Sequence, residues 1–191
     1  DNPDLKIAMQ QNIQIIRRSD LLGRLFNNKH GIAIGGSNGK TTVCAMTSWI
    51  LDKAGHDPTV VGGGYVINFI TDKSLGNSKC GRSETVVIEA DESDGSLIKY
   101  TPKVSVITNI SRDHKTVEEL GELFSKFAEN TSDTVIINES CFHSIKINNS
   151  AKKVIKFGED SESDVSASQI SCNPFSSRFK VKDTDFEINV P

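Results

Sequence analysis

The sequence predicts an α/β fold, a P-loop-containing, mostly parallel sheet flanked by helices, with a small antiparallel sheet added near the C-terminus. Two observations predict this fold. Short apolar runs recur between residues 31 and 137 with helical segments between them, which is typical of parallel strands joined by right-handed crossovers. From Lys153 onward the apolar runs become short and alternating and are separated by Ser, Asp and Asn, which is typical of antiparallel strands.

The composition limits the classes of function. The chain has 191 residues, of which 36% are hydrophobic and 25% charged, as in ordinary soluble domains. Its formal net charge is −3 and its Lys and Arg residues are scattered, which argues against nucleic acid as a partner. No run of 18 apolar residues occurs, so we expect no membrane partner and a cytoplasmic location. The four cysteines are far apart and include no CxxC pair, and we expect free thiols.

The first elements lead to a glycine-rich turn. Residues 1–29 contain polar, helix-like stretches and a short apolar run at 13–16 that could form a strand. Residues 31–34 predict a strand that ends in two glycines. Residues 42–54 predict a helix, because apolar side chains recur there at helical spacing, namely Val43, Met46, Ile50 and Leu51.

Further strands are predicted at 59–61, 85–88, 104–108 and 135–137, and an amphipathic helix at 116–130. The run at 85–88 leads directly into Glu89, and the run at 104–108 leads into Asn109. Open α/β sheets bind their ligands at the carboxyl ends of the strands. We therefore expect the functional site at this edge.

The turn at residues 36–42 has the composition of a phosphate-binding loop. Its glycines permit unusual backbone dihedrals, and the N-terminus of the following helix favours an anion. Lys40 can reach the outer phosphates of a nucleotide, and the Thr41 hydroxyl can bind magnesium. The alternative is a plain glycine turn before a helix, because the loop is shorter than the standard GxxxxGK[ST]. The predicted phosphate-binding residues are Gly36, Ser37, Asn38, Gly39, Lys40, Thr41 and Thr42.

Acidic residues and a histidine follow the next strands. Glu89 is placed to face Thr41 across the loop, and carboxylates are common magnesium ligands. His114 is a second candidate, although imidazole is a less usual magnesium ligand and a capping or core role is slightly favoured by the residues alone. For the acidic cluster that contains Asp91, Glu92 and Asp94, a solvated turn and a direct role are equally compatible with the sequence.

Four segments in this order resemble the Mur ligases, and most closely their alanine-adding branch: HGIAIGGSNGKTT (30–42), AGHDPTVVGGG (54–64), VIEADESDGS (87–96) and VITNISRDH (106–114). The resemblance implies an ATP-dependent ligase of peptidoglycan precursor synthesis. Such an enzyme would join L-alanine to UDP-N-acetylmuramate through an acyl phosphate, with Mg²⁺ as cofactor.

The resemblance also implies roles for individual residues. Lys40 would hold the phosphates, Thr41 and Glu89 the first magnesium ion, and His114 the second, which reverses the preference from the residues alone. The acidic segment favours the alanine-adding branch or the related tripeptide-recycling ligases. Within it, the resemblance places three residues near the sugar substrate: Ser93, Asp94 and Ser96.

The family's domain order implies that residues 1–29 are the end of the UDP-binding domain with a linker. Residues 30–191 would then be the central ATP-binding domain, incomplete at its C-terminal end and without the C-terminal domain, and the chain alone should be inactive. Ser37 and Asn38 replace a usual Thr-His, and residues 115–118 lack a usual Leu-Asp-x-Tyr. These departures leave open a peptide-recycling, folylpolyglutamate or cyanophycin-type ligase, or a nucleotide-binding module without catalysis.

Overall fold

The protein is described by a computed structural model at residues 2–111, 115–147 and 152–189. Within these residues ten strands form one sheet in the order β12-β11-β10-β9-β8-β7-β1-β6-β2-β5, and two more form a small hairpin, β3-β4. The strands are β1 (His30–Gly35), β2 (Thr59–Val61), β3 (Ile70–Thr71), β4 (Ser74–Leu75), β5 (Ser78–Lys79), β6 (Thr85–Glu89), β7 (Val104–Ile107), β8 (Thr134–Asn138), β9 (Lys153–Gly158), β10 (Val165–Asn173), β11 (Ser176–Val181) and β12 (Thr184–Ile188). The helices are α1 (Pro3–Gln10), α2 (Arg18–Phe26), α3 (Lys40–Lys53), α4 (Val117–Asn130) and α5 (Glu139–Phe142), with short 3₁₀ turns at Ile67–Phe69 and Ser96–Lys99.

Strand β1 lies in the middle of the parallel part of the sheet. It pairs in parallel with β6 on one side and with β7 on the other. Strands β7, β8 and β9 continue the parallel pairing, and β2 pairs in parallel with β6. The predicted mostly parallel sheet is therefore confirmed, and so are the strands expected at 31–34, 59–61, 85–88, 104–108 and 135–137 and the helices expected at 42–54 and 116–130.

Two sequence expectations are wrong. Residues 13–16 form no strand; they belong to an extended linker between α1 and α2, where Ile13 and Ile15 are exposed. β-branched residues favour a strand only where a neighbouring strand or a packed face is available, and the linker has neither in the described part of the chain. The run at 154–157 was expected in the antiparallel sheet, but β9 pairs in parallel with β8. Among the described residues from 152 onward, antiparallel pairing joins only β10, β11 and β12.

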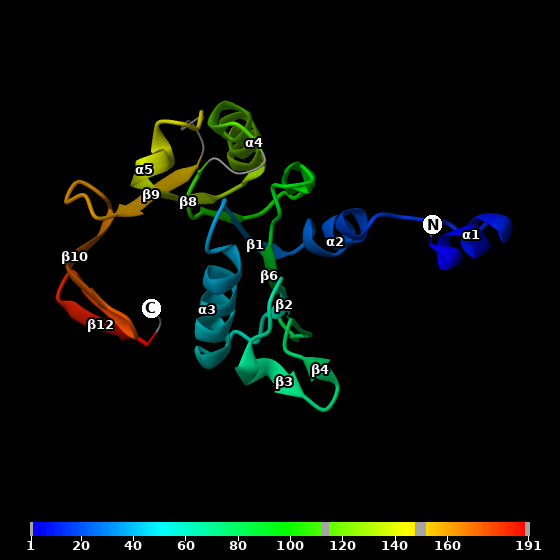
Figure 1. Ribbon diagram of the computed structural model, residues 1–191, viewed down its shortest axis with the longest axis horizontal. Coiled ribbons are helices and arrows are strands. Elements are labelled where there is room, and N and C mark those ends of the chain that lie inside the picture. Colours follow the sequence, from blue (N-terminus) through cyan, green and yellow to red (C-terminus); the bar gives the residue numbers. More distant parts are fainter. Residues whose placement is uncertain (1, 112–114, 148–151, 190–191) are drawn as a thin grey trace.

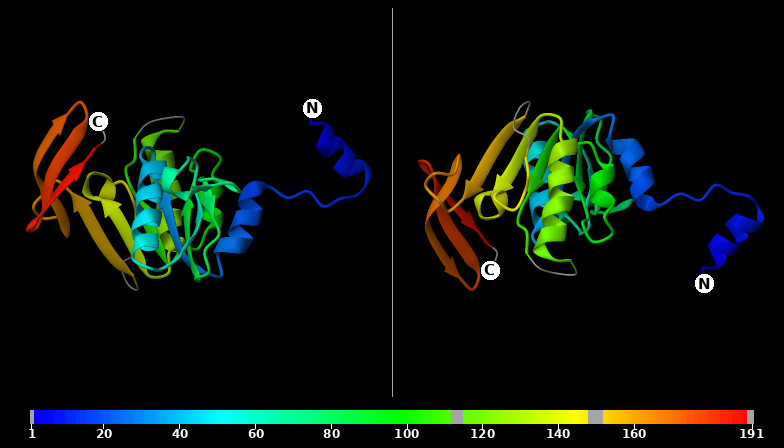
Figure 2. Two further views of the ribbon diagram at one scale, coloured as in Figure 1. Left: turned by 90° about the horizontal axis from the view of Figure 1, so that it is seen from below. Right: turned by 90° about the horizontal axis from the view of Figure 1, so that it is seen from above.

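The two faces of the sheet are covered by different helices (Figure 2), with α3 on one face and α4 on the other. Alternate residues of each buried strand point to opposite faces. On the α3 face the buried cluster is Ile34, Cys44 and Val87. On the other face Phe124 and Phe127 of α4 join a larger buried cluster that includes Ala33, Val86, Ile88 and Ile107.

Helix α2 is anchored to the body of the domain, whereas α1 is not. Phe26 of α2 is fully buried and meets the Tyr100 ring edge to face, with ring centroids 5.8 Å apart. Gly31 makes room for it, because a Cβ there would lie 2.3 Å from the Phe26 ring. Helix α1 has no buried residue and lies away from the sheet at the end of the linker (Figure 1). None of the helices in the described ranges is long and apolar enough to cross a membrane.

Candidate functional site

The glycine turn between β1 and α3 has the backbone of a phosphate loop. Gly36 and Gly39 have φ values of +137° and +77°, which L side chains rarely adopt. A Cβ at Gly36 would also lie 2.0 Å from Thr108 Oγ1, so this position has no room for one. Gly39 is the N-cap of α3, and no side chain of the described residues caps the helix. The first amide groups of α3 are therefore left for a ligand, and the helix dipole favours an anion there.

The loop is held against the end of β7. The amide groups of Ser37 and Asn38 donate to the backbone oxygen and to Oδ1 of Asn109, both at 3.0 Å. The Asn38 carbonyl accepts from Thr108 Oγ1 at 2.6 Å and from Asn109 Nδ2 at 2.9 Å. The Ser37 hydroxyl donates to the Ser111 carbonyl at 3.0 Å, and Asn38 Nδ2 donates to Ser111 Oγ at 3.1 Å. Ser37 and Asn38 thus help to fix the loop shape, and their predicted contact with phosphate stays a prediction.

Sequence reasoning missed this contribution of Asn109. The signal available was its position directly after the run at 104–108, at the same sheet edge as the loop. Because β7 pairs beside β1, Asn109 lies against the loop that follows β1. Only the strand order, which the sequence does not reveal, distinguishes this neighbour from a more distant one.

Thr41 and Glu89 meet in the structure. The Thr41 hydroxyl donates to Glu89 Oε1 at 3.0 Å, and the Gly63 amide donates to Glu89 Oε2 at 2.8 Å. Added Cβ atoms at Gly63 and Gly64 would lie 2.7 Å from Glu89 Oε2 and from Thr41 Cγ2, respectively. Gly63 and Gly64 therefore let the backbone approach this pair closely. A cavity of about 80 Å³ lies beside it, lined by Arg18, Val61, Gly62, Gly63, Glu89 and Asp91.

The Thr41 and Glu89 oxygens suit magnesium. Magnesium binds six oxygens at about 2.0–2.1 Å in near-octahedral geometry, which places neighbouring ligand oxygens roughly 3 Å apart. The separation of 3.0 Å between Thr41 Oγ1 and Glu89 Oε1 matches that spacing. Within the described ranges no group of three or more His, Cys, Asp or Glu side chains is arranged to hold a metal. The donor set is therefore the sparse one that magnesium uses when phosphate and water complete its shell.

Behind this pair, Cys44 lies under the loop on the α3 side of the sheet and is buried. Burial raises the pKa of its thiol to about 12, and the nearby Glu89 carboxylate contributes to the rise. The thiol is therefore neutral at physiological pH and behaves as a packing residue.

Lys40 points back into the loop and makes a buried ion pair. Its Nζ donates to the Gly36 carbonyl at 2.8 Å and lies 3.0 and 2.9 Å from the two carboxylate oxygens of Glu92. Only 15% of the Lys40 side chain and 9% of the Glu92 side chain are exposed. The solvated-turn interpretation is therefore wrong for Glu92. A carboxylate three residues beyond Glu89 was the available signal, but the sequence could not show that its side chain turns inward.

The other acidic residues of this segment stabilise their own turn. Asp91 accepts from the Ser93 amide at 2.9 Å, and Asp94 accepts from the Ser96 amide at 2.8 Å. Hydrogen bonds from the Ser96 side chain and amide lower the pKa of Asp94. Ser93 and Asp94 are exposed, whereas Ser96 is buried. Their expected place near a sugar substrate stays a prediction, and the predicted ligand His114 lies outside the described residues.

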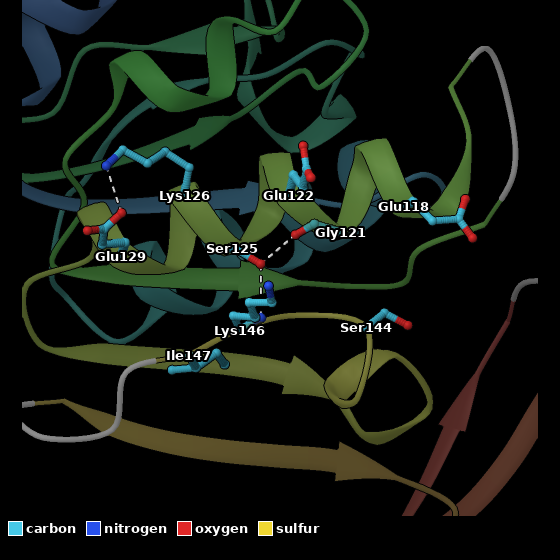
Figure 3. A pocket seen from close by; sticks show the side chains of 9 residues that line it. All are labelled: Glu118, Gly121, Glu122, Ser125, Lys126, Glu129, Ser144, Lys146 and Ile147. Atoms are coloured by element: carbon cyan, nitrogen blue, oxygen red, sulfur yellow. Dashed lines mark hydrogen bonds and ion pairs between the residues drawn. The ribbon is translucent and has the colours of Figure 1, made fainter.

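A groove of about 800 Å³ lies elsewhere, between α4 and residues 144–147. Figure 3 shows that its side chains come from one helix face and the facing segment. Lys126 pairs with Glu129 of the same helix at 2.7 Å, and both side chains are more than half exposed. The groove shares no residue with the phosphate loop and brings no set of reactive groups together, so we place the functional site at the loop.

Comparisons with known proteins agree with this geometry. The protein family described as "Mur ligase middle domain" matches residues 34–191. A UDP-N-acetylmuramate--L-alanine ligase of Sulfurihydrogenibium sp. (strain YO3AOP1) is 38% identical over 200 aligned positions, which cover 100% of this chain and 43% of that protein. The enzyme of the same name from Aquifex aeolicus (strain VF5) is 46% identical over 132 residues, covering 66% of this chain and 28% of its own. The chain thus spans less than half the length of these relatives.

Solved structures extend the comparison. The crystal structure of UDP-N-acetylmuramate-alanine ligase MurC from Thermotoga maritima has a TM-score of 0.79 at 25% identity, covering 100% of this chain and 44% of that chain. MurF ligase from Thermotoga maritima, crystallised in complex with ADP, has a TM-score of 0.60 at 17% identity, covering 91% of this chain and 44% of that one. The second match bears on the fold alone.

Proposed function

The chain belongs to the Mur ligase family, and from this premise we propose that it supplies the ATP-binding part of a ligase that joins L-alanine to UDP-N-acetylmuramate. The observation that carries the proposal is the phosphate loop with Lys40 inside it and the Thr41–Glu89 pair at its rim. The names of the relatives support the choice of substrates. A ligase with these substrates acts in peptidoglycan precursor synthesis.

In this proposal the substrate carboxylate attacks the γ-phosphorus of ATP, the bond to the bridging oxygen breaks, and ADP leaves. The resulting acyl phosphate is then attacked by the amine of L-alanine, which displaces phosphate and gives the amide. The chain's own part is to bind and orient the triphosphate. Lys40 and the first amides of α3 would contact its oxygens and offset the charge that develops during transfer.

Thr41 and Glu89 are the residues that would hold a magnesium ion, as their spacing allows. When bound, the ion would neutralise charge on the transferring phosphoryl group. The Gly63 amide keeps the Glu89 carboxylate directed toward Thr41. His114 remains the proposed residue for a second ion.

The nucleotide part of the proposal is tested with Lys40→Ala. We expect wild-type chain to bind Mg-ATP and Mg-ADP in a calorimetric titration and Lys40→Ala to lose at least a hundredfold in affinity with an unchanged circular dichroism spectrum. Lys126→Ala removes an exposed lysine on α4 and serves as the control, with wild-type affinity expected. Equal affinities for wild type and Lys40→Ala would end the proposal.

The substrate part is tested with the protein in its natural sequence context. Purified enzyme is offered ATP, UDP-N-acetylmuramate and either L-alanine or a cell-wall tripeptide, and phosphate release is measured. Release that depends on L-alanine supports the proposal. Release only with the tripeptide assigns a peptide-recycling ligase instead, and binding of ATP without any release assigns a nucleotide-binding module.

A further inference from the structure

Lys40, the residue expected to bind phosphate, already has an anion. Both Glu92 carboxylate oxygens lie within 3.0 Å of Lys40 Nζ, and both side chains are nearly buried. Removing two charges from water costs several kcal/mol for each ion, and only close pairing offsets that cost. Lys40 therefore cannot turn toward a nucleotide without leaving the Glu92 charge uncompensated.

Among the described residues, Lys40 is the one cation that pairs with the Glu92 carboxylate. Its Oε2 atom is buried, and no group in the described ranges donates a well-formed hydrogen bond to it. The ionic contact with Lys40 at 2.9 Å is what compensates its charge. Glu92 is thus not a general structural carboxylate with several donors, unlike Glu89, which accepts from both Thr41 and Gly63.

A second cation lies next to the same residue. Lys115 Nζ donates to the backbone carbonyls of Glu92 and Ser93 at 3.1 and 2.5 Å. Lys115 therefore contacts the backbone of residue 92 while Lys40 holds its side chain. A rotation of the Glu92 side chain could exchange one lysine for the other without moving the turn.

We propose that Glu92 is a positioning residue for Lys40. Its carboxylate pairs with Lys40 in place of the nucleotide phosphates, and when nucleotide enters, the Glu92 side chain rotates and pairs with Lys115 instead. This inference rests on the proposed function. Nucleotide binding then competes with an internal anion, and Glu92 lowers the affinity while it keeps Lys40 folded inside the loop before nucleotide enters.

Two substitutions with opposite expected signs test the exchange. Glu92→Gln removes the competing charge at nearly constant shape, and we expect it to tighten Mg-ATP and Mg-ADP binding about tenfold. Lys115→Met removes the receiving cation but leaves the Lys40–Glu92 pair, and we expect it to weaken binding about tenfold. A merely structural role for Glu92 predicts a loss of affinity in both variants.

Two controls separate pairing from bulk charge. Glu122→Gln removes the same charge from an exposed position on α4 and should bind as wild type. Glu92→Asp keeps the charge but shortens its reach to Lys40, and we expect an intermediate gain in affinity. A gain in Glu122→Gln equal to that in Glu92→Gln would overturn the inference.

The outcomes also separate this inference from the proposed function. If wild type binds nucleotide and Glu92→Gln binds equally or more weakly, the inference fails and the proposed function stands. If wild type does not bind nucleotide at all, both fail. Should Glu92→Gln not fold, Glu92→Asp decides, because equal or weaker nucleotide affinity in that variant overturns the inference.

Discussion

The loop edge of the sheet and the β10–β12 extension differ in strand pairing, parallel beneath the loop and antiparallel in the extension, and they also differ in burial. Beneath the loop, β1, β6 and β7 carry fully buried side chains such as Ile34, Val87 and Ile107. Among the described residues from 152 onward, only Ser163 and Ser176 are buried. Hydrophobic burial is thus concentrated where the loop must be held in one shape. The extension should therefore contribute little to the shape of the loop. The predictions below test this difference in burial between the two regions.

The largest effect is expected for Phe127→Ala. Phe127 is fully buried, and its ring lies under the last residue of β1, just before the loop, 3.5 Å from where a Cβ of Gly35 would be. Removing such a ring should lower the free energy of unfolding by about 3–5 kcal/mol in urea denaturation. Phe175→Ala removes an equal ring from the β10–β11 turn, where 82% of it is exposed, and should change stability by less than about 0.5 kcal/mol. Similar losses for the two variants would break the comparison.

A smaller but local effect is expected for Gly36→Ala. The positive φ and the close Thr108 hydroxyl should together cost about 1–3 kcal/mol. Because Thr108 Oγ1 also holds the Asn38 carbonyl, nucleotide affinity should fall with stability. Gly39→Ala, where a Cβ meets nothing within 4 Å, is the matched variant and should cost only about 1 kcal/mol. Thermal unfolding and ADP titration measure both quantities, and unchanged affinity in Gly36→Ala would contradict the loop's dependence on this position.

In the extension, Phe186→Ala should have a smaller effect. The Phe186 ring stacks on Phe179 across β11 and β12 with centroids 5.3 Å apart, and it is 43% exposed. Loss of such an aromatic pair costs about 0.5–1.5 kcal/mol. Nucleotide affinity should remain at the wild-type value. A change in affinity would show that the extension shapes the loop after all.

The smallest effect concerns acid stability at the far end of α3. Hydrogen bonds from Lys79, and then from Arg82, hold the pKa of Asp57 well below its usual range. A carboxyl whose pKa is lower in the folded state stabilises the fold at pH values above its pKa in the unfolded state, about 3.9. This stabilisation is lost as the pH falls toward the pKa of the folded state. Asp57→Asn should therefore flatten the stability profile below about pH 4. If stability falls equally steeply below about pH 4 in wild type and variant, Asp57 is not the source of this pH dependence.

The sequence predicted most of the parallel core and part of the site. Apolar runs and glycines identify β1, the loop and α3, and the carboxyl-edge argument predicts that Glu89 approaches Thr41. The contacts of Asn109 and Glu92 were missed because they depend on strand order and on the direction of one side chain. Periodicity shows neither, since both arise only when distant segments pack. The same limit explains two further errors. The local pattern suggested a strand at residues 13–16, where no partner strand is available among the described residues, and antiparallel pairing for β9, which pairs in parallel with β8.

The hydrogen bonds between the loop and residues 108–111 also have a consequence for biosynthesis. The partners of Ser37 and Asn38 lie 70 or more residues later in the chain. A nascent chain has made the whole glycine turn long before Asn109 and Ser111 leave the ribosome, so the turn has no partners to fix it during that interval. Contacts of such long sequence separation form slowly, because a long segment must first be ordered. The loop should therefore become able to bind phosphate late in folding, in one step, when β7 pairs with β1.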